Sequence, residues 1–196
     1  MRLKYNAPTV LTFTFISAAV WILSLTVFPS LTRDWFMVPG KGGFSASRVQ
    51  SWVTLLTHVL GHSNWDHLLS NFTLILLVGP ILEENYGSVT LLFMMAITAM
   101  VTGALNVLFF TTGLLGASGV LFMMILLASF TNFNEGEIPL TFILILVLYL
   151  GREFYNSFTN SNISEFAHIA GGFCGSLFGF FSPGRSGSGR GRVRQG

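Results

Sequence analysis

Long apolar stretches, separated by short polar segments, run through most of the chain. Six of them are predicted to be helical spans, at about residues 9–28, 65–82, 88–110, 118–130, 138–155 and 165–181. The first stretch has about 20 residues, which at 1.5 Å per residue covers the roughly 30 Å hydrocarbon core of a bilayer. The pattern therefore predicts an all-α polytopic membrane protein with six transmembrane helices.

The segments between the stretches divide into two kinds. Polar turns are expected at 83–87, 111–113 and 131–137. The segment at 29–51 is longer and keeps large aromatic side chains, including Trp35 and Phe44, and Trp52 follows it directly. Tryptophan is favoured where a membrane meets water, so this loop is expected to lie on or in the membrane interface.

Composition agrees with the pattern. The chain is 52% hydrophobic and 9% charged, whereas soluble domains carry about 25% charged residues. Basic residues lie before residue 9 and after residue 182, which predicts that both termini are cytoplasmic. The expected division is a short N-terminus at 1–8, one six-span domain at 9–182 and a disordered basic tail at 183–196. The one cysteine, Cys174, is expected to be a small packing residue.

The fourth span is too short to cross a bilayer. As a helix from Ser118 to Phe130 it would rise only about 20 Å. Irregular backbone at 111–117 must then supply the missing depth, and such backbone is tolerated only inside protein or beside a water-filled cavity. Ser118 would lie below the membrane surface at a helix N-terminus, where the N–H groups of Ala117 and Ser118 favour an oxyanion. The alternative is that Gly116, Ala117, Ser118 and Gly119 form a helix-packing patch.

Polar residues on the second and third spans are predicted to face a cavity or a partner helix. His67 and Asn71 are four residues apart and share one helical face. His58 and His62 have the same spacing upstream and could hold water at the cavity mouth. Asp66 points away from His67 and is expected to cap the second span. A polar stripe follows on the third span: Thr98, Thr102 and Asn106.

His168 opens a glycine ladder on the sixth span. Gly171, Gly175 and Gly179 repeat every four residues, so this helix can pack its backbone closely on a neighbour. If that neighbour is the fourth span, His168 reaches Ser118 and can act as its general base. A histidine metal site is disfavoured, because the sequence has no His-Glu-x-x-His motif and no suitable cysteine partner. No metal and no cofactor are expected.

Together these motifs resemble the rhomboid family of intramembrane serine proteases. The resemblance covers about residues 9–182 and keeps the family's order and spacing. The matching motifs are His67 and Asn71, Gly79-x-x-x-Glu83-x-x-x-Gly87, Gly116-Ala117-Ser118-Gly119, Ala167-His168, and the pair Gly171 and Gly175.

The resemblance implies a Ser118–His168 dyad that cleaves single-span or polytopic membrane proteins near their outer end, in the lipid bilayer. His67 and Asn71 would help the Ser118 amide hold the oxyanion, and His58 would lie where water is retained. Glu83 would be structural, and the fifth span with residues 156–164 would form a mobile gate. The resemblance also implies a bacterial inner membrane and no nucleic-acid partner.

Two positions depart from the family pattern. Trp52 is followed by Val53 where many members have arginine, and Phe122 stands where many have tyrosine. Two other functions stay open from sequence. One is a rhomboid-like protein that binds membrane clients without cutting them, and the other is a small transporter or channel with a histidine-lined path. His62 has no assigned role.

Overall fold

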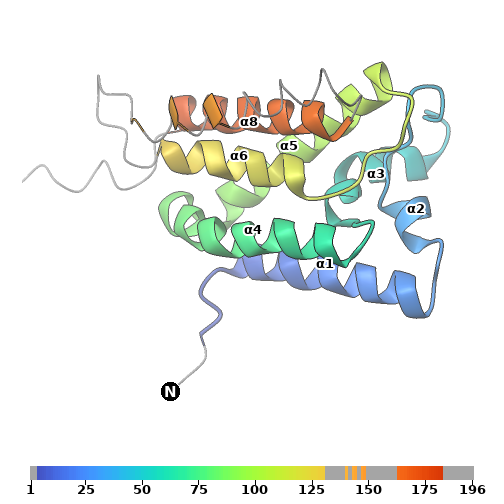
Figure 1. The fold of residues 1–196 in the computed structure, drawn as a ribbon, viewed down its shortest axis with the longest axis horizontal. Coiled ribbons are helices and arrows are strands. Elements are labelled where there is room, and N and C mark those ends of the chain that lie inside the picture. The colour runs from blue at the N-terminus through green and yellow to red at the C-terminus, as the bar shows by residue number, and fades with distance from the viewer. Residues whose placement is uncertain (1–3, 131–139, 141–142, 145–146, 149–162, 183–196) are drawn as a thin grey trace, which may run out of the picture.

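The computed structural model is a helical bundle, and it describes residues 4–130, 140, 143–144, 147–148 and 163–182 (Figure 1). The bounds of its helices are α1 Pro8–Thr26, α2 Leu31–Trp35, α3 Val49–Thr57, η1 His58–Leu60, α4 Trp65–Tyr86, α5 Ser88–Phe109, α6 Ser118–Ser129 and α8 Ile163–Phe181. No β-strand occurs within these described ranges. The all-helical fold predicted from the apolar pattern is therefore confirmed.

Three of the helices, α1, α4 and α5, are long and apolar enough to cross a membrane. α6 and the 166–181 part of α8 are apolar but shorter. Most of the predicted span at 138–155, and the gate at 156–164, lie outside the described residues. The count of six spans therefore stays a prediction.

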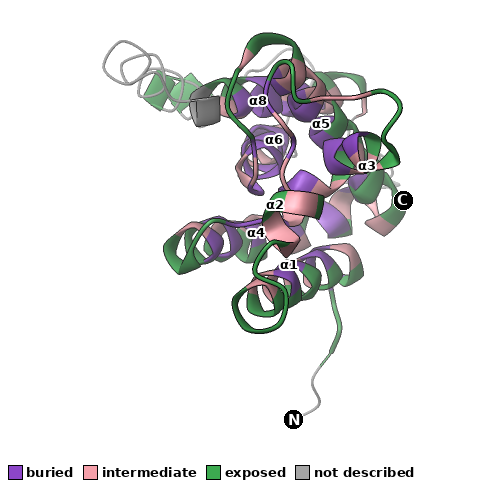
Figure 2. Ribbon diagram, turned by 90° about the vertical axis from the view of Figure 1, so that its right-hand side faces the viewer, coloured by how far each residue is buried: buried purple, intermediate pink, exposed green. Residues whose placement is uncertain are grey.

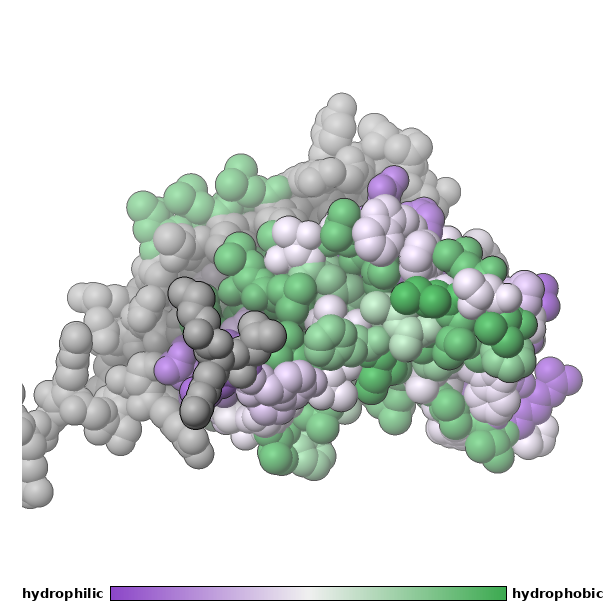
Figure 3. All heavy atoms as spheres, turned by 90° about the horizontal axis from the view of Figure 1, so that it is seen from below, coloured by the Kyte–Doolittle hydropathy of each residue, from purple (hydrophilic) through white to green (hydrophobic). Residues whose placement is uncertain are grey.

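Apolar side chains also cover the outside of the bundle. Phe15, Leu25, Leu77 and Phe93 are each more than 60% exposed. Seen from below, hydrophobic residues cover much of the described surface, and the most hydrophilic ones lie near its edges (Figure 3). Water disfavours so much exposed apolar surface, whereas lipid does not. The chain is an integral membrane protein.

The centre of the bundle is α6. It packs against α8 on one side and α4 on the other, with α5 behind it, and it is almost wholly buried (Figure 2). A helix that is apolar all round is expected to be enclosed by other elements. Its 12 residues rise about 18 Å, so the predicted short fourth helix is confirmed.

The second long helix extends further than the sequence pattern predicts. A polar turn is expected to begin at Glu83, but α4 continues to Tyr86 and ends where Gly87 adopts a φ of 84°. Glu83 is buried, and its carboxylate accepts the N–H groups of Thr9 at 2.8 Å and Val10 at 3.0 Å. These N–H groups belong to the first turn of α1 and have no partner within that helix. Glu83 therefore caps α1 from α4.

The N-terminal cap of α4 also differs from the expectation. Asn64, not Asp66, is the capping residue, and its side chain accepts the N–H of His67 at 2.8 Å. Asp66 lies in the first helical turn. A carboxylate there still favours the positive end of the helix dipole.

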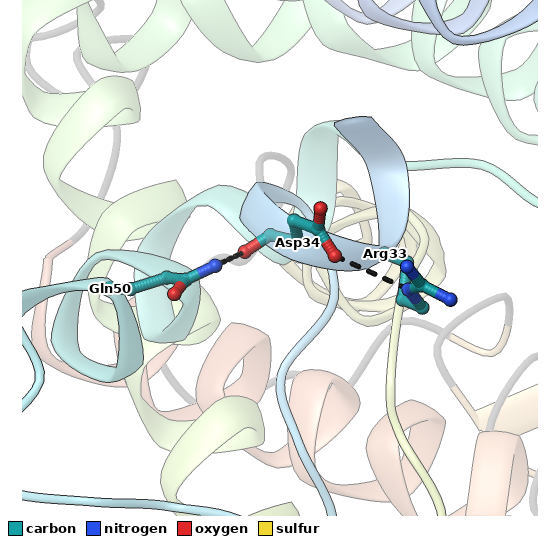
Figure 4. Close-up of polar contacts among 3 residues, drawn as sticks. All are labelled: Arg33, Asp34 and Gln50. Carbon is teal, nitrogen blue, oxygen red and sulfur yellow. Dashed lines mark hydrogen bonds and ion pairs between the residues drawn. The ribbon is translucent and has the colours of Figure 1, made fainter. Parts of the chain in front are cut away.

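The segment at 29–51 is more ordered than a plain loop. It contains α2, and Asp34 on that helix contacts Arg33 at 3.2 Å while its carbonyl accepts the side-chain N–H of Gln50 (Figure 4). Gln50 belongs to α3, a helix that the apolar pattern does not predict. The hydrogen bond between Gln50 and Asp34 thus joins α3 to α2, beside the long helices.

We predict that Glu83→Gln destabilises the protein by about 1–3 kcal/mol, because an amide offers one oxygen and no charge to two N–H groups at a helix N-terminus. Thermal unfolding in detergent would measure this change. Glu84→Gln is the matched control, since Glu84 is exposed next to it. Equal melting temperatures for the two variants would contradict the capping role.

Candidate active site

The segment that precedes Ser118 is fixed by contacts with the long loop at 29–51. Val38 and Leu114 exchange two backbone hydrogen bonds, at 2.9 and 3.0 Å. The side-chain nitrogen of Asn106 donates to the carbonyls of Thr112 at 3.1 Å and Pro39 at 3.3 Å. Irregular backbone within the bundle is therefore hydrogen-bonded rather than left free.

Gly116 makes the turn into α6 possible. Its φ is 120°, which L side chains rarely adopt, and its N–H donates to the carbonyl of His58 at 2.9 Å. A Cβ atom at this position would lie 2.6 Å from Cε1 of His67. The imidazole of His67 thus covers the turn directly, and only glycine meets both conditions.

Ser118 is the first residue of α6, and it is partly exposed while Ala117 and Gly119 on either side are buried. Its backbone N–H belongs to the first turn, whose N–H groups lack acceptors within the helix. The N–H of Ala117 donates to Nε2 of His62 at 3.5 Å. The sequence predicts that this N–H supports an oxyanion, and in the structure it contacts His62.

α6 and α8 approach each other backbone to backbone. A Cβ atom on Gly171 would lie 2.0 Å from the carbonyl oxygen of Gly119, and one on Gly175 would lie 2.2 Å from that of Met123. The sequence predicts that the glycine ladder packs closely on a neighbouring helix, and the structure identifies that helix as α6. This contact sets the N-terminal part of α8 beside the start of α6.

His168 lies against the same face of α6 that carries Ser118. Its ring stacks on the ring of Phe122, with centroids 4.3 Å apart and planes within 2°. Phe122 is four residues after Ser118, so the two share one face of the helix. His168 is partly exposed as a whole, and Nδ1 of its ring is buried. The phenylalanine that replaces the more usual tyrosine still packs against this histidine.

His62 also belongs to the site, although the sequence indicates no role for it. Its Nε2 lies 3.2 Å from the side-chain nitrogen of Asn71 and 3.5 Å from the N–H of Ala117. Its ring meets the ring of His67 edge-on, with 5.0 Å between centroids. The sequence feature that could have indicated this place is the position of His62, nine residues before Asn71 and just outside the start of the second span.

His58 faces the polar stripe of α5 instead. Its Nε2 lies 3.3 Å from the hydroxyl of Thr102, and its Nδ1 lies 3.2 Å from the carbonyl of Thr54. Burial lowers the pKa of His58 to about 4, so the ring is neutral at pH 7. Nearby, the side-chain oxygen of Asn106 is buried without a hydrogen-bond partner among the described residues.

The predicted site residues are thus brought to one end of α6, with two exceptions. Glu83 and Gly175 lie further along the bundle, where Glu83 caps α1 and Gly175 packs on Met123. Thr98 of the polar stripe donates to the carbonyl of Met94 within its own helix. Cys174 is buried and free, as expected for a packing residue.

Comparisons with known proteins agree on one family. A family model for the Rhomboid domain matches residues 49–184. The Rhomboid protease GlpG of Haemophilus influenzae is 24% identical over 128 residues, which are 64% of this chain and 67% of the relative.

Two proteins of Arabidopsis thaliana are also similar. Rhomboid-like protein 11, chloroplastic, is 23% identical over 165 residues, or 83% of this chain and 56% of the relative. RHOMBOID-like protein 7 is 30% identical over 136 residues, or 64% of this chain and 41% of the relative. The chain spans about two thirds of the bacterial relative and about half or less of the plant relatives.

We predict that Gly171→Ala separates α8 from α6 and destabilises the protein by about 1–3 kcal/mol, because the added methyl group meets backbone that cannot yield. Gly172→Ala is the control, since a Cβ atom there would make an ordinary contact, 3.6 Å from Leu126. Thermal unfolding of the two variants in one detergent compares them. A Gly171→Ala protein as stable as Gly172→Ala would refute the close contact.

Proposed function

Because the chain belongs to the rhomboid family, we propose that it is an intramembrane serine protease with Ser118 as nucleophile and His168 as general base. The observation that supports this dyad most is the stack of His168 on Phe122. It holds an imidazole on the face of α6 that carries Ser118, one helical turn away. The glycine contacts between α6 and α8 keep both side chains at the same end.

The proposed reaction follows acyl-enzyme chemistry. Ser118 attacks the carbonyl of a peptide bond while His168 removes its proton, and His168 then protonates the leaving amine. A water molecule releases the acyl group from Ser118. An intact substrate helix hides its carbonyls in hydrogen bonds, so the segment to be cut must unwind first.

The oxyanion that forms would be held by three donors. They are the backbone N–H of Ser118, the side chain of His67 and the side-chain nitrogen of Asn71. The N–H of Ser118 is at the positive end of the α6 dipole, which favours negative charge. One N–H of the Asn71 side chain already points to His62, so its second N–H would donate to the oxyanion. Ala117 would support the oxyanion site indirectly, because its N–H contacts His62.

Water would be held next to His58. The unpartnered oxygen of Asn106 is buried, and the hydroxyl of Thr102 and the ring of His58 are polar groups in the same region. Buried water typically makes about three hydrogen bonds to such groups. His58, Thr102 and Asn106 would then hold the hydrolytic water.

The substrates would be membrane proteins of one or more spans, cut near the outer face of a bacterial inner membrane. Both termini of the chain would be cytoplasmic, with 9–182 as the protease domain and 183–196 as a basic tail. The chemistry requires no metal, so a chelator is expected to leave cleavage unchanged. A client-binding protein that does not cut would not need both Ser118 and His168, and this chain has both.

We predict that Ser118→Ala lowers the cleavage of a single-span test substrate in detergent at least about 1,000-fold, because the nucleophile is removed. Ser129→Ala is the control at the other end of α6, where the hydroxyl donates to the carbonyl of Ile125 within the same helix. Cleavage by Ser118→Ala at the parent rate would reject the protease mechanism and leave the client-binding alternative.

A further inference from the structure

We propose that His62 is a positioning residue of the active site, whose single unprotonated ring nitrogen holds both Asn71 and the backbone before Ser118. The inference rests on the proposed function and deepens it, because it names the group that orients the oxyanion donors. It is carried by hydrogen-bond geometry around one buried imidazole.

The contacts of His62 fix which nitrogen carries the proton. A backbone N–H can only donate, so the 3.5 Å contact from Ala117 requires a lone pair on Nε2. The side-chain nitrogen of Asn71, 3.2 Å away, is a donor to the same lone pair. Nδ1 lies 3.3 Å from the carbonyl of Leu60, and there it must donate. His62 is therefore the neutral Nδ1–H tautomer.

The surroundings of His62 maintain that state. The residue is 2% exposed, and its ring packs on Phe72 with 5.5 Å between centroids. Burial, helped by the neighbouring His67, lowers the pKa of His62 to about 4. Among the described residues, His67 is the titratable group whose ring lies against it. His62 thus stays an acceptor at neutral pH.

One acceptor therefore connects two separate elements of the site. Asn71 is on α4, whereas Ala117 precedes α6. Without the acceptor, the amide of Asn71 is free to rotate about its side-chain bonds, and the turn at Gly116 and Ala117 loses an anchor. A small displacement of an oxyanion donor greatly weakens its stabilisation of the oxyanion, because the donor must be in place before the charge forms.

Two substitutions of similar polarity test this role. In His62→Gln the side-chain oxygen reaches about as far as Nε2, whereas in His62→Asn it reaches only as far as Nδ1. Neither side chain titrates. We expect His62→Gln to keep kcat within about threefold of the parent, and His62→Asn to lose about 10- to 100-fold in kcat with KM changed less than about twofold.

A double-mutant comparison separates positioning from general stability. If His62 acts through Asn71, adding His62→Asn to Asn71→Ala lowers kcat less than about threefold further. Thr98→Val removes a buried hydroxyl that contacts neither His62 nor Asn71. Thermal unfolding in detergent compares its stability with that of His62→Asn, so that a loss of kcat can be separated from general destabilisation. Equal kcat for the Gln and Asn variants, or full additivity with Asn71→Ala, would overturn the positioning role.

The outcome is distinguishable from failure of the protease mechanism itself. If Ser118→Ala abolishes cleavage while His62→Asn retains the parent kcat, only the role of His62 is lost. If Ser118→Ala retains full cleavage, the proposed function fails first.

Discussion

The contact between the backbones of α6 and α8 is the constraint on which the rest of the site depends. Gly171 and Gly175 allow α8 to approach Gly119 and Met123 more closely than any side chain would permit. Between helices in lipid there is little hydrophobic driving force, so close van der Waals packing must supply the association. That approach brings His168 to Phe122 and hence to the face of Ser118.

A second constraint follows from the shortness of α6. The segment before it must run as irregular backbone within the bundle, and every buried N–H and carbonyl there needs a partner. Val38, Asn106, His58 and His62 provide such partners from three other parts of the chain. The polar groups that support the proposed chemistry are therefore also the groups that make this backbone path tolerable.

Much of this arrangement could be predicted from the sequence, because periodicity and glycine spacing carry it. The long helices, the short α6 and the packing of the glycine ladder follow from residues that act locally or in regular repeats. The continuation of α4 through Glu83 could not be predicted in this way. Its carboxylate is satisfied by N–H groups of α1, more than 70 residues away in the chain.

The histidines show the same limit. His58 and His62 have a spacing that puts two residues on one helical face, but the helix ends between them and Gly61 is extended. Their rings therefore turn to different partners, Thr102 for His58 and Asn71 for His62. Spacing alone does not reveal where a helix stops, so the role of His62 emerges only from the fold.

The proposed function requires Ser118 and His168 to act together. The most direct measurement is mass spectrometry of the protein after reaction with a fluorophosphonate, in the parent and in His168→Ala. We expect that the parent carries the phosphonyl group on Ser118 and that His168→Ala does not react. A label on another residue, or labelling of Ser118 that is undiminished without His168, would contradict it.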